Sequence, residues 1–137
     1  MKFNNDCARK ILMEIEKIEY GENLRISDLQ KKMSEYSLDE ILRMINLFNI
    51  EYYVNLVDKN PYDKIPTYEG NRISSLSEKG YRALDKIRND DVWNLMKEKI
   101  DDFDNLSFFT IIEIASRINL VKYNRLFNLP DNVDSRY

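Results

Sequence analysis

The sequence contains no histidine and only one cysteine among its 137 residues. Histidine is the general base of most catalytic triads and a ligand in most transition-metal sites, so its absence argues against both kinds of site. Cys7 stands near a helix start, where a thiolate is favoured, but no histidine is present to act as its base. A lone cysteine also excludes an internal disulfide. We therefore expect no enzyme, no cofactor and no metal site.

Glycine and long apolar runs are also scarce. None of the three glycines lies in a phosphate-binding loop such as GxGxxG. No apolar run approaches the roughly 18 residues that suggest a membrane span, and the N-terminus does not resemble a signal peptide. Hydrophobic residues make up 43% and charged residues 33%, which is a globular composition. We expect a cytoplasmic protein with no membrane partner.

The spacing of apolar residues predicts mostly helices. A first helix follows Asp6, and a short extended stretch covers residues 24–26. Ser27 is expected to cap a helix over residues 28–35, and Ser37 opens a capping box with Glu40. Gly21 suits a left-handed turn between the first helix and the extended stretch.

The period changes after the helix over residues 37–49. Residues 51–57 are rich in aromatic and β-branched side chains, and residues 72–76 are expected to return as the partner strand of a hairpin. Further helices start at Ser77, Asn89 and Ser107, with Tyr81, Leu84 and Ile87 facing inward and Trp93 in the core. The prediction is a mainly α fold with a small β-hairpin: one winged-helix-like domain over residues 1–127. Within it, residues 1–76 form the three-helix core and wing, residues 77–127 form C-terminal helices, and residues 128–137 form a flexible tail.

One stretch resembles a known family. Residues 76–93, LSEKGYRALDKIRNDDVW, are similar to the LTxxGHxFLDxIRxDxxW segment of a phage- and prophage-encoded family catalogued as domain of unknown function 2513. Residues 9–16 resemble its first helix, residues 36–41 resemble the start of its third, and the resemblance spans roughly residues 6–120. Tyr81 departs from the family, which usually has histidine there. The resemblance implies a winged-helix-like phage protein in the host cytoplasm and brings no catalytic residues to transfer.

In a DNA-binding protein of this plan, the helix over residues 37–49 would read the bases. Arg43, Asn46 and Asn49 are side-chain types that hydrogen-bond base edges, and we place them on its solvent side. The expected phosphate contacts are Lys31, Lys32, Lys59, Lys64 and Arg72. Asp39 and Glu40 in the first turn would repel phosphates, although acids also suit a helix N-terminus. The net charge of −3 counts against strong nonspecific DNA binding, and a merely solvated face of this helix stays open as an alternative.

A protein-binding module that inhibits or redirects a host protein is the second hypothesis. Tyr62 and Tyr68 in the wing loop supply aromatic surface of the kind enriched at protein interfaces, whereas we expect Tyr52 and Tyr53 to pack on the core. On the DNA-binding hypothesis we expect a homodimer through the C-terminal helices, because these helices hold more apolar residues than one core stripe needs. These residues are Phe108, Phe109, Ile111, Ile112 and Ile114. Near the family match, Asp85 and Arg88 are expected to form an i,i+3 ion pair rather than an active site.

Overall fold

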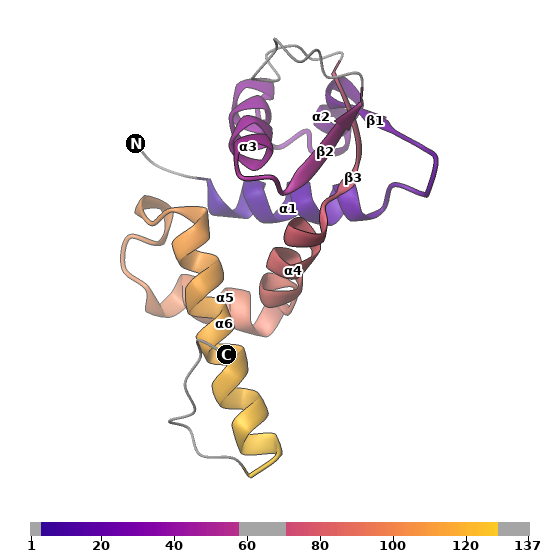
Figure 1. The fold of residues 1–137 in the computed structure, drawn as a ribbon. Helices are drawn as coiled ribbons and strands as arrows, with labels where there is room; N and C mark the ends of the chain where they lie inside the picture. The colour runs from indigo at the N-terminus through magenta and orange to yellow at the C-terminus, as the bar shows by residue number, and fades with distance from the viewer. Residues whose placement is uncertain (1–3, 58–70, 129–137) are drawn as a thin grey trace. The chain divides into compact units, whose positions relative to one another are not determined.

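The computed structural model describes residues 4–57 and 71–128, and it is mainly helical with a small antiparallel sheet (Figure 1). Its elements are, in order, α1 (Asn5–Glu16), β1 (Leu24–Arg25), α2 (Ile26–Lys32), α3 (Leu38–Ile50), β2 (Val54–Val57), β3 (Arg72–Leu76), α4 (Glu78–Ile87), α5 (Asp90–Lys99), the 3-10 turn η1 (Phe103–Asn105) and α6 (Phe108–Leu126). The order predicted from the sequence is confirmed, and the sheet gains a third strand from the extended stretch at residues 24–25. Within the described residues, no helix is long and apolar enough to cross a membrane.

The chain divides into two compact units. The first, which we name the N-terminal unit, is Asp6–Leu84; the second, the C-terminal unit, contains the described residues 85–128 together with Asn4 and Asn5. The sequence placed residues 1–127 in one domain, with a division after residue 76. The expected tail falls almost wholly on residues 129–137, outside the described part of the chain.

The N-terminal unit is built around a core drawn from every one of its helices and from the sheet. Its side chains with at most 1% exposure include Ile11, Leu12, Ile15, Ile26, Leu29, Met33, Ile41, Ile45, Phe48 and Ile73. The strand order is β1-β3-β2, so β3 is the central strand and pairs with both neighbours in antiparallel register. The β2–β3 register shifts between Asn55 and Leu56, which places a bulge in this ladder.

Side-chain caps fix four helix starts where the sequence placed them, and at the start of α4 Ser77 Oγ accepts the Gly80 N–H at 3.0 Å. Ser37 Oγ accepts the Glu40 N–H at 3.2 Å, Asn89 Oδ1 accepts the Val92 N–H at 3.1 Å, and Ser107 Oγ accepts the Thr110 N–H at 3.2 Å. Each bond satisfies one of the donors that a helix N-terminus leaves without an intrahelical partner.

Strand pairing overrides the predicted cap of α2. The helix begins at Ile26, directly after β1, and its N-cap residue Arg25 makes no side-chain cap bond. The Ile26 N–H donates to the Asn71 carbonyl at 2.9 Å, which extends the β1–β3 ladder by one bond. The expected Ser27 cap is therefore wrong, because the ladder already fixes the chain where the helix starts.

The junction between α3 and β2 also differs from the prediction. Tyr52 lies in a turn with φ of 60° and is 76% exposed, so it neither joins the strand nor packs on the core. Tyr53 is buried as expected, and its ring stacks on Phe48 with centroids 5.8 Å apart. Tyr81 was expected to face inward but is 41% exposed.

The C-terminal unit packs α5, η1 and α6 around Trp93. This ring is buried and meets Phe103 edge to face at a centroid distance of 5.3 Å, which confirms its expected place in the core. Asn5, also buried, donates from Nδ2 to the carbonyl of Phe103 at 2.9 Å and to that of Leu106 at 3.1 Å. Asn5, the first residue of α1, is thus hydrogen-bonded to the turn before α6.

Candidate nucleic-acid interface

The helix α3 has one buried face and one accessible face. Buried side chains recur along it at helical spacing, namely Ile41, Met44, Ile45, Phe48 and Asn49. Asp39 and Arg43 are exposed, and Ile50 at the helix end is 52% exposed. The accessible face therefore mixes one cation, one acid and an apolar end.

Of the three side chains predicted to read bases, Arg43 alone is exposed. Asn46 is half-buried, and its Oδ1 is buried without a hydrogen-bond partner among the described residues. Asn49 is 8% exposed, so its predicted place on the solvent side is wrong. It follows Ile45 by four residues and Ile41 by eight, which puts it on the core side of the helix. This spacing was visible in the sequence.

Two lysines predicted to contact phosphates lie exposed at the end of α2. Lys31 Nζ is 3.9 Å from the Asp28 carboxylate, a loose surface pair that holds the side chain weakly. Lys32 makes no ion pair within the part of the chain that the structure describes. Both ammonium groups are available to a partner.

The sheet adds a cation that the sequence reasoning missed. Arg72, a predicted phosphate contact, is the first residue of β3 and stands opposite Arg25 of β1. Only the strand register, which pairs segments far apart in the chain, places Arg25 beside Arg72. No local signal in the sequence therefore marks Arg25 as part of this surface. The predicted Lys59, Lys64, Tyr62 and Tyr68 lie outside the described residues.

The thiol of Cys7 is not activated as a nucleophile. Cys7 is fully buried in α1, and burial, followed by the nearby carboxylates of Glu40 and Glu35, raises the pKa of its thiol to about 12. Desolvation thus outweighs the helix N-terminus as an influence on this thiol.

Over the described residues, no three His, Cys, Asp or Glu side chains gather as a metal site. The ion pair predicted near the family match is confirmed, with Arg88 Nη2 2.9 Å from Asp85 Oδ1.

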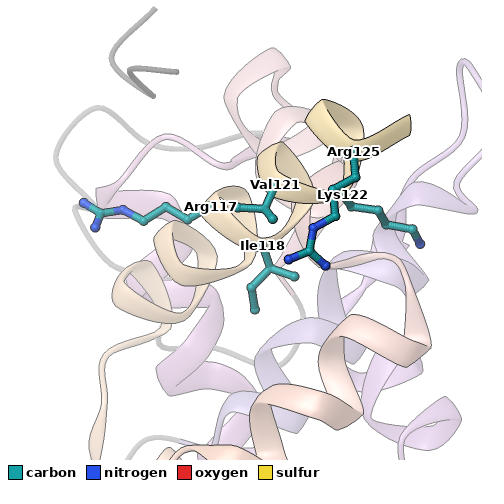
Figure 2. Close-up of a pocket in the computed structure, with 5 residues that line it drawn as sticks. All are labelled: Arg117, Ile118, Val121, Lys122 and Arg125. Carbon is teal, nitrogen blue, oxygen red and sulfur yellow. The ribbon is translucent and has the colours of Figure 1, made fainter. Parts of the chain in front are cut away.

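A second accessible surface lies on α6. A pocket of about 430 Å³ is lined by Arg117, Ile118, Val121, Lys122 and Arg125. Figure 2 shows Ile118 and Val121 between the Arg117 side chain and those of Lys122 and Arg125. Most of the residues expected to support a homodimer lie in the core of the chain. Phe108, Ile111 and Ile112 are buried, and of the five only Phe109 and Ile114 are partly exposed.

Comparison with known proteins assigns the family. The family model described as "Hypothetical protein (DUF2513)" matches residues 2–106, which include α1 to α5 and the sheet. No curated protein and no solved structure matches the chain. Because the match covers well over half of the sequence, the chain belongs to the DUF2513 family.

Proposed function

We propose that this protein is a phage-type winged-helix regulator that binds duplex DNA in the cytoplasm of its host cell. The order α1-β1-α2-α3-β2-β3, with a sheet ordered β1-β3-β2, supports this interpretation. In a protein of this plan α3 enters the major groove and the hairpin flanks the phosphate backbone. The antiparallel pair β2–β3 is then the wing.

The observation that carries the proposal is a set of accessible cations on two successive helices. Lys31 and Lys32 end α2, and Arg43 lies on the accessible face of α3. Lys32 and Arg43 form no ion pair with any described residue, so neither needs to break an internal contact to meet a phosphate or a guanine edge.

The overall charge limits how strong this binding can be. The net charge is −3, and Asp39 stands one turn before Arg43 on the same accessible face. Even if Arg25, Lys31, Lys32, Arg43 and Arg72 each met a separate phosphate, log K would fall with log salt at a slope no steeper than about −4.5. We therefore expect binding that is measurable at low salt and strongly weakened at physiological salt on random sequence.

Fluorescence anisotropy on a labelled 20-base-pair duplex tests the proposal. Titrations at about 20, 50, 100 and 200 mM salt give the slope for the wild type and for Lys32→Gln and Arg43→Gln. Each change is expected to reduce the slope by about one. Lys86→Gln and Arg117→Gln, which remove exposed cations from α4 and α6, are the matched controls and are expected to keep the wild-type slope.

An absence of binding at low salt would overturn the proposal. A wild-type protein that shows no binding at 20 mM salt, while its circular dichroism spectrum is that of a folded helical protein, is not a DNA-binding regulator of this kind.

A protein-binding module on the same scaffold is the second candidate. Ile50, the last residue of α3, and Tyr52, in the turn that follows, are 52% and 76% exposed, and each presents apolar surface that a phosphate contact does not need. If this surface is an interface, Ile50→Asp is expected to abolish capture of a host protein. If wild type and Ile50→Asp capture the same proteins, the surface has no such role.

A further inference from the structure

The pairing of β1 with β3 brings two arginines into direct opposition. Residues whose numbers add to 97 face each other, so Leu24 pairs with Ile73 and Arg25 with Arg72. The next pair, Ile26 and Asn71, is joined by the Ile26 N–H bond to the Asn71 carbonyl at 2.9 Å. Hydrogen-bonded and non-hydrogen-bonded pairs alternate along an antiparallel ladder. Arg25 and Arg72 are therefore a non-hydrogen-bonded pair, the kind whose Cα atoms approach to about 4.5 Å.

Both arginines extend from the accessible face of the sheet. Ile73, the neighbour of Arg72, is fully buried and points into the core, so Arg72 and its partner Arg25 point to the opposite side. Arg25 is exposed and Arg72 partly exposed. Their row continues across β3 to Val57 of β2, which is neutral.

No carboxylate among the described residues pairs with either arginine. Within the described residues, neither arginine forms an ion pair or a side-chain hydrogen bond. Like charges directly opposite each other in a sheet destabilise it. Two arginines on directly opposed positions thus have no anionic partner among the described residues, and their planar donor forks match the oxygens of a phosphate better than a lysine does.

We propose that Arg25 and Arg72 together clamp one phosphodiester group of the DNA backbone. This inference rests on the proposed DNA-binding function and gives the sheet a part in it. Arg25 is followed at once by α2, which carries Lys31 and Lys32, and Arg72 is the first residue of β3, so the clamp joins this helix to the β2–β3 pair. The two non-bridging oxygens of one phosphate each accept from one arginine.

A shared phosphate has a distinct signature in the salt dependence of binding. The slope reports how many phosphates are neutralised, at about 0.9 per phosphate on duplex DNA. Arg25→Gln and Arg72→Gln are each expected to weaken binding about ten-fold at low salt, because a hydrogen bond to a charged group is lost. The double variant is expected to reduce the slope by about 0.9 in total. A total reduction of about 1.8 would mean two separate phosphates and would overturn the clamp.

A conservative variant separates charge from geometry. Arg25→Lys keeps the charge and loses the fork, so it is expected to keep the wild-type slope and still bind more weakly than wild type. Arg117→Gln is the matched control, being an exposed arginine on α6 with no ion pair to any described residue. Addition of 10 mM inorganic phosphate at constant ionic strength is expected to leave DNA bound; full displacement would indicate a site for free phosphate instead.

Thermal unfolding without DNA gives an independent readout. Because removing one arginine relieves the repulsion, Arg25→Gln and Arg72→Gln are expected to have a higher Tm than wild type, whereas Arg117→Gln is expected to match it. A lower Tm in both sheet variants would show that the arginines have an internal structural role and would overturn the clamp.

The failures of the two proposals are distinguishable. If the wild type does not bind the labelled duplex at 20 mM salt, the proposed function falls and the clamp falls with it. If the wild type binds, Lys32→Gln and Arg43→Gln weaken it, and Arg25→Gln and Arg72→Gln leave affinity and slope unchanged, only the clamp is refuted.

Discussion

Replacement of Gly80 by alanine tests the packing at the start of α4. A Cβ atom at this position would lie 2.1 Å from the carbonyl oxygen of Tyr53 and 3.1 Å from its carbonyl carbon. Contacts below 3.0 Å are not tolerated, so helix and carbonyl must separate by about 1 Å. The same carbonyl accepts the Ser77 N–H at 2.9 Å, and that bond would lengthen as they separate.

Three effects set the change in the free energy of unfolding that Gly80→Ala causes. Overpacking against backbone costs about 1–3 kcal/mol, and weakening the bond from Ser77 to the Tyr53 carbonyl costs up to about 1 kcal/mol more. Alanine returns up to about 1 kcal/mol as the better helix former. The expected free energy of unfolding of Gly80→Ala is therefore lower than that of wild type by about 1–3 kcal/mol. For a cooperative unit of about 80 residues, each kcal/mol lowers Tm by about 4–8 °C.

Thermal denaturation followed by circular dichroism at 222 nm measures this change. Arg82→Ala is the matched control, because it lies in the same helix, is exposed and loses only the surface pair with Glu78. Such i,i+4 pairs contribute about 0.3–0.5 kcal/mol, so its Tm is expected to stay close to that of wild type. A Gly80→Ala protein as stable as wild type, or more stable, would refute the close approach of α4 to the Tyr53 carbonyl.

Two further predictions concern buried polar groups. Because the pKa of the Cys7 thiol is raised from 9.0 to about 12, its contribution to stability is complete below pH 9 and is lost as pH rises from 9 towards 12. At pH 8 a thiol reagent should label the native protein far more slowly than the urea-unfolded protein. Equal labelling rates would contradict the burial of Cys7. Asn5→Ala removes both amide donations to the carbonyls of Phe103 and Leu106, so a urea titration should show a loss of about 1–3 kcal/mol, and an unchanged midpoint would show that these bonds contribute nothing.

Local signals in the sequence predicted the elements well. Ser37, Asn89 and Ser107 fixed helix starts because a cap acts within three residues and depends little on the rest of the fold. The bounds predicted for the last strand, residues 72–76, coincide with β3. The start of α2 was missed because the ladder bond between Ile26 and Asn71, which no local pattern reveals, decides it.

The candidate site was predicted less completely. The exposure of Arg43 followed from helical spacing, and the same spacing, applied from Ile41 and Ile45, places Asn49 inward. The turn at Tyr52 has a positive φ, which is uncommon for tyrosine and is imposed by the surrounding fold rather than by local preference. Arg25 entered the site only through its register with Arg72, because a cross-strand neighbour is set by tertiary pairing.

The bond between Asn5 and the Phe103 carbonyl has a consequence for how the chain folds. It joins residues 98 positions apart, and the whole N-terminal unit lies in the loop that it closes. The entropy of closing a loop rises with the length of flexible chain within it. If residues 6–84 have already collapsed, far less flexible chain remains, so completion of the C-terminal unit is expected to be fastest when the other unit folds first. Variants that slow the folding of residues 6–84 should then also delay the fluorescence change that reports the burial of Trp93.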